Sequence, residues 1–270
     1  SDELFLGYPW YRATAWNERL GRIYFPLAPR PLRGAARRIT RRLPRSLRRY
    51  AERSVLALDP GPRGLFYENF AVFPDRLRQE LLADSAFQNG RDPYAEGLRC
   101  YEETAGGVLD RMSHADLQTY LVELLMKQDQ MSMAASIESR VPFLDHEFVE
   151  RVVRLPSRLK VRGLTTKAVL REALKDLVPR EIIQRPKMGF PVPIGRWLRG
   201  PFWSIVEDFV LGPRARERGF FKPAVLRRLA EEHRSGVREH GDRLWLLVNL
   251  EMWQRIFLEG EDRATVSRAA

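Results

Sequence analysis

The chain has 270 residues, 44% hydrophobic and 30% charged, which is enough for one large domain or two small ones with a hydrophobic core. Its net charge of +11 is compatible with nucleic acid, an anionic membrane surface or a phosphate-bearing ligand. The sequence contains no run of about 18 apolar residues, so no membrane-spanning helix is predicted. The single cysteine, Cys100, cannot form an internal disulfide, and no spacing of Cys and His residues suggests a zinc site. We therefore expect a cytoplasmic protein.

The chain opens with SDELFLGYPWYR, in which Asp2 and Glu3 precede an apolar pair and a Gly-Tyr-Pro turn. Adjacent carboxylates near a helix start commonly interact with the helix dipole. A Mg²⁺ ion that bridges carboxylate and phosphate oxygens would use the same groups. Because this opening lacks an initiator methionine, we expect the chain to be the later part of a longer protein.

The most basic stretch runs from Arg30 to Arg53, RPLRGAARRITRRLPRSLRRYAER. Apolar residues recur in it at helical spacing, and Pro44 restarts the pattern; they are Leu32, Ala35, Ala36, Ile39 and Leu43. The pattern predicts two surface helices with solvated arginine faces. We favour this interpretation over an RNA- or lipid-phosphate-binding patch because aromatic stacking partners are sparse among the arginines.

Several short helices are predicted between residues 65 and 112, one of them capped by Asp75. The apolar run LQTYLVELLMKQDQMSMAAS then predicts a buried helix, interrupted by Lys127 and Asp129. Asp145 is predicted to cap the next helix, HEFVERVVRLP.

Two carboxylates, Asp129 and Glu138, fall in this otherwise apolar region. Burying a carboxylate is costly unless it is paired. Arg140 offers a structural ion pair. Alternatively, the carboxylates face a cavity and accept hydrogen bonds from a cationic group of a ligand, and residue chemistry leaves both interpretations open.

The segment TTKAVLREALKDLVP predicts a helix capped by Thr165 or Thr166. Lys167 would reinforce an anion site at its start, although it opposes the dipole when no anion is bound. Three further helices, each followed by glycine, are predicted in FWSIVEDFVLG, KPAVLRRLAEEHRSG and DRLWLLVNLEMWQRIFLEG. Strand-like alternation is scarce, so the chain is predicted to be mainly helical.

Between these helices lies IIQRPKMGFPVPIGRWL, where three prolines and two glycines surround Lys187. Proline fixes φ and removes a hydrogen-bond donor, so no helix is expected to run through this segment. A lysine in such a stiff loop is preorganised to meet developing negative charge. An ordinary exposed loop lysine remains the alternative.

Four segments taken in order resemble the synthetase domain of glutamine-dependent asparagine synthetases, whose relatives include β-lactam synthetases and lasso-peptide cyclases. They are SDELFLGYPWYR, QDQMSMAASIESRVPFLDHEFVE, LPSRLKVRGLTTKAVLREAL and RPKMGFPVPIGRWLRG. The resemblance implies that this mainly α chain is the C-terminal part of an α/β ATP-pyrophosphatase (adenine nucleotide α-hydrolase-like) domain whose parallel sheet lies mostly upstream. It implies a variable basic helical region over about 21–111, an active-site-bearing helical region over about 112–200 and C-terminal helices over 201–260.

The implied function is an ATP- and Mg²⁺-dependent ligase that adenylates a carboxylate, aspartate in the family, and releases pyrophosphate. Ammonia from an upstream glutaminase then forms the amide. This chain contains neither the family's Ser-Gly-Gly-x-Asp-Ser phosphate loop nor a glutaminase cysteine, since Cys100 is internal, so we expect it to be inactive without those segments. The alternatives are an amidotransferase for another carboxylate, in sugar or natural-product modification, and a non-catalytic remnant that acts as a binding module. A homodimer is compatible with the resemblance, and nucleic acid is not an expected partner.

Carried over position by position, the resemblance assigns Asp2 to Mg²⁺, Lys187 to the charge on the α-phosphate and the leaving group, and Glu138 to the neighbourhood of the acceptor. Further substrate- or phosphate-binding candidates are Glu3, Asp129, Arg140, Thr166, Lys167 and Gly189. Leu6 stands where the family usually has glycine.

Overall fold

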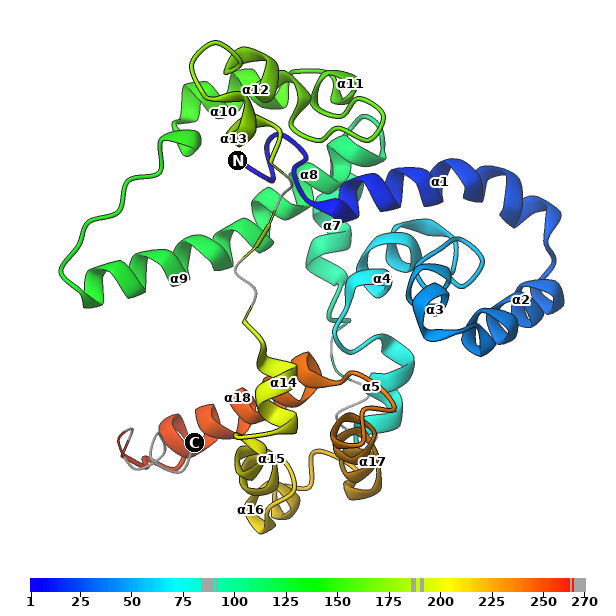
Figure 1. The fold of residues 1–270 in the computed structure, drawn as a ribbon, viewed down its shortest axis with the longest axis vertical. Coiled ribbons are helices and arrows are strands. Elements are labelled where there is room, and N and C mark those ends of the chain that lie inside the picture. Colours follow the sequence, from blue (N-terminus) through cyan, green and yellow to red (C-terminus); the bar gives the residue numbers. More distant parts are fainter. Residues whose placement is uncertain (84–89, 91, 186–187, 190–191, 263, 265–270) are drawn as a thin grey trace. The chain divides into compact units, whose positions relative to one another are not determined.

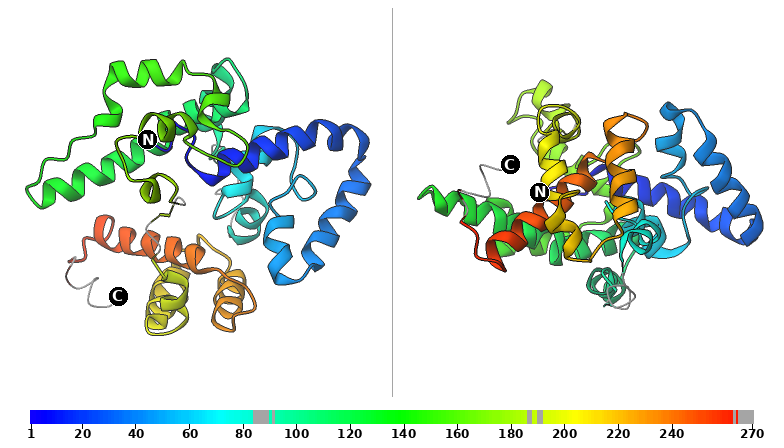
Figure 2. Two further views of the ribbon diagram at one scale, coloured as in Figure 1. Left: turned by 45° about the horizontal axis from the view of Figure 1, so that its top comes forward. Right: turned by 90° about the horizontal axis from the view of Figure 1, so that it is seen from below.

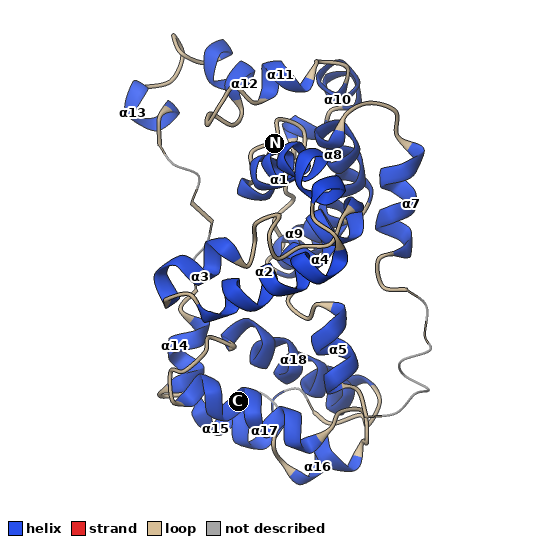
Figure 3. Ribbon diagram, turned by 90° about the vertical axis from the view of Figure 1, so that its right-hand side faces the viewer, coloured by secondary structure: helices blue, strands red, loops and turns tan. Residues whose placement is uncertain are grey.

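In the computed structural model, which describes residues 1–83, 90, 92–185, 188, 189, 192–262 and 264 and omits the side chains of Arg45 and Arg49, the chain is mainly helical (Figure 1). Over these ranges the only β-type pairing consists of isolated bridges, Leu82 with Phe221 and Arg162 with Thr165 (Figure 3). None of the helices within them is long and apolar enough to cross a membrane. The prediction of a mainly helical chain is confirmed.

The chain divides into two compact units, each built from two separate stretches of sequence. Unit 1 comprises Ser1–Phe70 and Asp92–Lys187. Unit 2 comprises Ala71–Arg91 and Met188–Ala270. The boundary between Lys187 and Met188 falls inside the proline-rich segment.

Unit 1 contains most of the helices, several of them only one or two turns long. They are α1 (Pro9–Leu27), α2 (Arg30–Arg42), α3 (Arg45–Ala51), the π-helical η1 (Arg63–Tyr67), α4 (Glu68–Phe70), α7 (Ala95–Glu103), α8 (Val108–Gln118), α9 (Tyr120–Ala134), the 3-10 turn η2 (Pro142–Leu144), α10 (His146–Val153), α11 (Ser157–Lys160), α12 (Ala168–Ala173) and α13 (Arg180–Ile183). The predicted break at Pro44 is confirmed, because α2 ends and α3 begins on either side of it.

Two apolar clusters form the core of unit 1, and the N-terminal loop contributes to both. Leu6 packs with Tyr11 and Met112 in one cluster, while Leu4 and Phe5 pack with residues of α10 and α12 in the other. Burial of these large side chains stabilises the loop by roughly 1.5–3 kcal/mol each. The start of the chain is therefore held firmly against α8, α10 and α12.

Local capping is predicted correctly at one helix and wrongly at another. The Oδ1 atom of Asp145 accepts a hydrogen bond from the backbone N–H of Phe148 at 3.0 Å, which confirms the predicted cap of α10. Asp75 is the first residue of its helix, with Pro74 in the extended cap conformation before it. Its carboxylate instead pairs with Arg78, at 2.8 Å.

The prediction of a buried helix over the apolar run is wrong. Residues Tyr120–Ala134 do form α9, but none of them is buried. Val122, Met126 and Met133 are among its exposed side chains. The apolar composition predicts the helix correctly, but the described part of unit 1 covers its apolar side chains only in part.

Unit 2 is a small helical assembly in which every predicted helix is confirmed. It contains α5 (Asp75–Leu81), α14 (Ile194–Arg199), α15 (Trp203–Phe209), α16 (Pro213–Glu217), α17 (Pro223–Arg234) and α18 (Gly241–Phe257). Figure 2 shows α18 lying along α15 and α17. The core gathers Leu198, Phe209, Leu229, Leu244 and Val248 from four helices.

A buried polar network fixes the beginning of α14 and of α18. His233 is fully buried, and its Nε2 lies 2.8 Å from the carbonyl oxygen of Gly195. His240 places Nε2 2.7 Å from Oε2 of Glu232, and its Nδ1 accepts from Nη1 of Arg243 at 2.7 Å. These contacts anchor the helix that follows the proline-rich segment.

Candidate functional site

The candidate site is built on the N-terminal loop, which folds back on itself before α1. The amide of Phe5 donates to the carbonyl of Ser1 at 3.0 Å, and that of Gly7 donates to the carbonyl of Asp2 at 2.7 Å. Leu4 and Phe5 are buried just beyond the two acidic residues. The apolar pair therefore fixes the place of the carboxylates that precede it.

Leu6 adopts a left-handed backbone conformation, with φ of 56°. For a residue with a Cβ this conformation costs about 1–2 kcal/mol. The side chain is only 1% exposed, and burying a leucine contributes roughly 1.5–3 kcal/mol. Packing therefore offsets the backbone strain, and the loop keeps the turn that a glycine would adopt freely.

Asp2 and Lys167 form an ion pair between this loop and the beginning of α12. Nζ of Lys167 lies 2.9 Å from Oδ1 of Asp2, and the two side chains are only 19% and 14% exposed. The backbone N–H of Lys167 also donates to the carbonyl of Phe5 at 3.2 Å. A Cβ at Gly7 would lie 2.1 Å from Oδ1 of Asp2 and 2.3 Å from Cε of Lys167, so the pair requires a glycine there.

The predicted threonine cap of α12 is wrong. Lys167 itself is the cap residue, with φ of 54°, and its carbonyl accepts the N–H of Arg171 at 2.9 Å. Thr165 instead pairs with the backbone of Arg162, and the carbonyl of Thr166 accepts Nε of Arg171 at 3.0 Å. The left-handed turn at Lys167 aims its side chain at Asp2 rather than along the helix, so the cation is balanced by a carboxylate.

Glu3 points into the core rather than toward Lys167. The hydroxyl of Tyr8 donates to its Oε1 at 2.7 Å, and the hydroxyl of Ser113 donates to its carbonyl oxygen at 2.7 Å. Burial, followed by the bond to Glu3, raises the pKa of Tyr8, which keeps this donor protonated. The described contacts of Glu3 are those of a residue that holds the loop in place.

Asp116 is a buried carboxylate that the sequence did not single out. Its Oδ2 accepts from the hydroxyl of Tyr11 at 2.6 Å and from Nε1 of Trp10 at 3.2 Å. Burial raises the pKa of Asp116 to about 6, although the two hydrogen bonds oppose the shift. The only sequence feature that could have drawn attention to Asp116 is its place on the apolar face of α8. Its hydrogen-bond partners could not be predicted, because they lie at the start of α1, far away in sequence.

The three candidates around the end of α9 are exposed. Glu138 pairs with Arg140 at 2.9 Å, with 69% and 81% of the two side chains accessible. Asp129 is exposed on α9. The expectation that these carboxylates are buried is therefore wrong, and the ion pair of Glu138 with Arg140 is an exposed one. Within the described structure no hydrogen bond or ion pair links these three residues to Asp2 or Lys167.

Lys187 lies outside the described residues, so its predicted role stays a prediction. The described residues between Ile183, where α13 ends, and Ile194, where α14 begins, are not helical, as the prolines predict. Gly189 is exposed, and a Cβ there would meet nothing within 4 Å. Steric crowding by described atoms therefore does not explain why a glycine occupies position 189.

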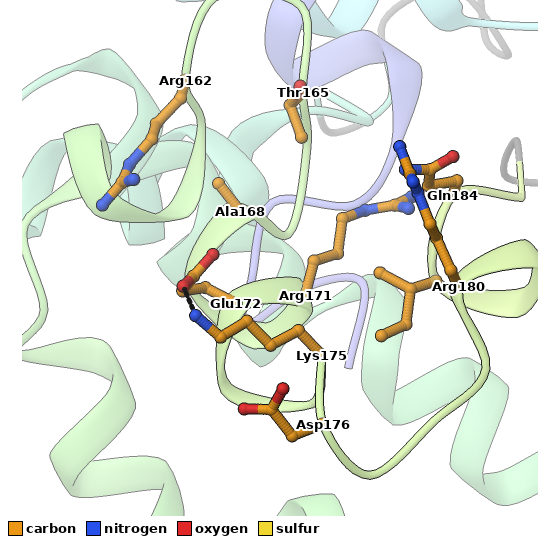
Figure 4. Close-up of a pocket in the computed structure, with 10 residues that line it drawn as sticks. Arg162, Thr165, Ala168, Arg171, Glu172, Lys175, Asp176, Arg180 and Gln184 are labelled. Atoms are coloured by element: carbon orange, nitrogen blue, oxygen red, sulfur yellow. Dashed lines mark hydrogen bonds and ion pairs between the residues drawn. The ribbon is translucent and has the colours of Figure 1, made fainter.

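A basic pocket of about 510 Å³ adjoins the Lys167 turn, between α12 and α13 (Figure 4). Lys175 pairs with Glu172 at 2.7 Å inside it. It is lined by Arg162, Thr165, Ala168, Arg171, Glu172, Lys175, Asp176, Arg180, Ile183 and Gln184. Four cationic side chains against two carboxylates make this side of unit 1 favourable for an anionic group.

The fit of a Mg²⁺ ion rests on Asp2. Among the described residues no group of three or more His, Cys, Asp or Glu side chains could enclose a metal ion. Mg²⁺ keeps several waters and is commonly bound through one or two carboxylates together with substrate phosphates. Because the Lys167 ammonium already pairs with Asp2 and would repel a second cation, a Mg²⁺ ion fits here only if phosphate oxygens share it, and a metal held by the described protein ligands alone does not fit.

Comparison with known proteins gives matches over nearly the whole chain. The asparagine synthase family model matches residues 1–255. Proteins named putative asparagine synthetase [glutamine-hydrolyzing] from Mycobacterium bovis and Mycobacterium tuberculosis are 35% identical over 264 residues, which cover 96% of this chain and 38% of each relative. Asparagine synthetase [glutamine-hydrolyzing] 1 of Bacillus subtilis is 27% identical over 96% of this chain and 40% of its own length. The chain thus spans about two fifths of the curated relatives that it matches. No solved structure gives a significant match.

Proposed function

Because the chain belongs to the asparagine synthase family, we propose that it forms the C-terminal part of the synthetase domain of an ATP-dependent amide-forming ligase. In the proposed reaction the carboxylate of aspartate is adenylated, pyrophosphate leaves, and ammonia derived from glutamine in an upstream domain attacks the acyl-adenylate. The observation that carries the proposal is the family match over residues 1–255, within which the motif residue Asp2 meets Lys167 at 2.9 Å.

The proposed chemistry places negative charge where this chain supplies cations and one carboxylate. Asp2 would hold Mg²⁺ together with phosphate oxygens, and a bound Mg²⁺ supplies charge neutralisation of those oxygens. Lys167 pairs with the Asp2 carboxylate and orients it, while the backbone bond to Phe5 fixes Lys167 in turn. Lys187 would stabilise the charge that grows on the α-phosphate and the leaving pyrophosphate.

The remaining candidates are proposed to contact substrates. Glu138, paired with Arg140 on the exposed segment after α9, would lie near the acceptor. Thr166 and Gly189 would lie near phosphate, one beside the basic pocket and the other in the proline-rich loop. Glu3 and Asp129 complete the proposed set.

The uncovered face of α9 supports the proposal that upstream segments belong to the same protein. The large apolar side chains exposed on one side of this helix are those of Val122, Met126 and Met133. Contiguous exposed apolar surface commonly marks an interaction site. We assign this face to the upstream part of an α/β ATP-pyrophosphatase domain, which would bring the phosphate-binding loop.

The proposal is tested by pyrophosphate release from the full-length protein, given ATP, Mg²⁺ and a panel of carboxylates. Aspartate is expected to give the fastest release. A faster release with another carboxylate would identify an amidotransferase of different specificity, and the absence of carboxylate-dependent release throughout the panel would contradict the ligase. Residues 1–270 alone should release no pyrophosphate.

Asp2→Asn sharpens the test because it removes the charge and keeps the shape of the side chain. It should raise the Mg²⁺ concentration needed for half-maximal release. The matched control is Glu147→Gln on α10, which removes an exposed carboxylate that pairs with Arg151 along the helix. An unchanged Mg²⁺ requirement in Asp2→Asn would remove Asp2 from the proposed metal site.

A further inference from the structure

The arginine-rich helices α2 and α3 carry large apolar side chains that unit 1 does not cover. Leu32 and Ile39 on α2 are 57% and 63% exposed, and Leu47 and Tyr50 on α3 are 57% and 64% exposed. The sequence predicts Leu32 and Ile39 on an apolar stripe. In the structure, however, the buried residue of α2 is Thr40. The predicted surface of solvated arginines is therefore incomplete, because exposed apolar side chains also lie on these helices.

The apolar side chains form short rows beside arginines. Leu32 and Ile39 are seven residues apart, about two helical turns, so they share one side of α2. Arg42 follows Ile39 by three residues and is its neighbour on the helix surface. Leu47 and Tyr50 are likewise three residues apart on α3. Arg38 and Arg42 flank the apolar row on α2, whereas Arg30 and Arg41 lie on the opposite side of the helix. We call these four apolar residues, with Arg38 and Arg42, the basic-apolar surface.

Charge on this surface is strongly one-sided. Ten arginines and one glutamate occur between Arg30 and Arg53. Arg37 pairs with Asp59. Among described side chains, no carboxylate lies within ion-pair distance of Arg38 or Arg42. The surface therefore offers positive charge for an external anionic partner.

The combination of arginines and aliphatic side chains favours an anionic bilayer over single-stranded nucleic acid as the partner. Single-stranded nucleic acid is commonly bound by arginines interleaved with aromatic stacking platforms, and Tyr50 is the one aromatic residue between Arg30 and Arg53. Helices that carry both arginines and exposed aliphatic side chains suit an anionic bilayer surface, where the aliphatic groups enter the acyl boundary and the arginines meet lipid phosphates.

We propose that α2 and α3 bind the surface of anionic phospholipid membranes through the basic-apolar surface. The helices would lie in the plane of the interface, because neither is long enough to span a bilayer. α1, with 19 residues and thus about 28 Å long, separates α2 from the N-terminal loop of the candidate site (Figure 1). Membrane contact and the proposed ligase chemistry therefore use different parts of unit 1.

The test is co-sedimentation of the full-length protein with vesicles of phosphatidylglycerol and phosphatidylcholine, compared with vesicles of phosphatidylcholine alone. Binding is expected only to the anionic vesicles, and it should weaken as salt is raised. Replacing Arg38 and Arg42 with glutamine should reduce partitioning by about 25-fold, because each arginine near an anionic surface contributes about fivefold.

A second variant separates insertion from charge alone. Leu32→Ser combined with Ile39→Ser keeps every arginine and should reduce partitioning by about tenfold or more. The matched controls are Leu164→Ser with Leu177→Ser, which are 73% and 79% exposed elsewhere in unit 1, and Arg151→Gln with Arg154→Gln on α10. These controls should bind as the unchanged protein does, and the thermal midpoint of each variant checks folding.

Three outcomes would overturn the proposal: no binding to anionic vesicles, equal binding by the Leu32→Ser/Ile39→Ser variant, or tight binding of single-stranded RNA that displaces the vesicles. The last would assign the surface to nucleic acid instead. Pyrophosphate release by the arginine variant should equal that of the unchanged protein. A failure of the membrane proposal would therefore not contradict the proposed ligase function, which is tested separately.

Discussion

Two helices of this chain are similar in length and apolar content but opposite in burial. α18 (Gly241–Phe257) buries residues along its whole length, including Leu244 and Val248, against α14, α15 and α17. α9 (Tyr120–Ala134) buries none, and Met126 is 57% exposed. Apolar spacing thus predicts that each segment is helical, but it does not tell whether the same chain provides the surface against which the helix packs.

The difference in burial implies that the two helices are stabilised in different ways. A helix with a buried apolar side gains much of its stability from tertiary contacts, whereas a helix without a buried residue depends more on its own propensity. α18 therefore belongs to the core of unit 2. α9 has the character of an interface helix, which is why we assign its exposed face to an upstream segment.

The largest expected effect comes from truncating one side chain in each helix. Leu244→Ala should lower the free energy of unfolding by about 2–5 kcal/mol, because it removes buried methyl groups and leaves a cavity. Met126→Ala in residues 1–270 should change it by less than about 0.5 kcal/mol, as for an exposed site. Urea unfolding of both variants measures the difference. A Met126→Ala cost comparable with that of Leu244→Ala would show that α9 is packed within this chain.

The second prediction concerns the pH dependence of unit 1. The pKa of Asp116 is about 6 in the folded chain, above its ordinary value, so the folded state binds this proton more tightly than the unfolded state. Stability from this group is therefore complete below about pH 4 and is lost as pH rises to about 6. The full loss is on the order of 3 kcal/mol, at about 1.36 kcal/mol per pKa unit.

Hydrogen exchange of α8 at pH 4 to 7 measures this loss locally, and Asp116→Asn provides the comparison. The asparagine has no ionisable proton, so protection of α8 in the variant should vary less with pH. An equal pH dependence in the two proteins would show that another group is responsible.

The third prediction has the opposite sign and applies to unit 2. Burial, together with the charges of Arg243 and Arg238, lowers the pKa of His240, although the bond to Glu232 opposes this shift. The folded state then binds this proton less tightly than the unfolded state. Stability is complete above the unfolded pKa of about 6.5 and falls as pH drops below it.

Because the bond to Glu232 offsets part of the burial, we expect a smaller effect at His240 than at Asp116. Protection at the start of α18, relative to the intrinsic exchange rate at each pH, should fall as pH drops below about 6.5, and His240→Asn should remove the change. Protection that rises on acidification would contradict the predicted sign.

Local chemistry in the sequence predicted several features that the structure confirms. Pro44 separates two helices, Asp145 caps α10, and the prolines around Lys187 exclude helix from the described part of that segment. Each depends on groups only a few residues apart, so the sequence suffices. The family resemblance added the motif residues, including Asp2.

Other features depend on contacts between distant segments and could not be predicted. Asp116 gains its importance from Tyr11 and Trp10, which a helical pattern in α8 does not reveal. The left-handed turn at Lys167 forms because its side chain meets Asp2 and its backbone meets Phe5. The threonines before it were plausible caps on local grounds alone, and tertiary contacts decided the outcome.

The most direct test of the account is ATP–pyrophosphate exchange by the full-length protein with Lys187→Ala. The account predicts that exchange falls by about 10²–10³ while ATP affinity and the thermal midpoint change little, because a fixed ammonium acts mainly on charge that develops in the transition state. Lys187→Arg should not restore the rate, since a planar guanidinium cannot place its charge at the same point. Near-normal exchange by Lys187→Ala would contradict the account and make Lys187 an ordinary loop residue.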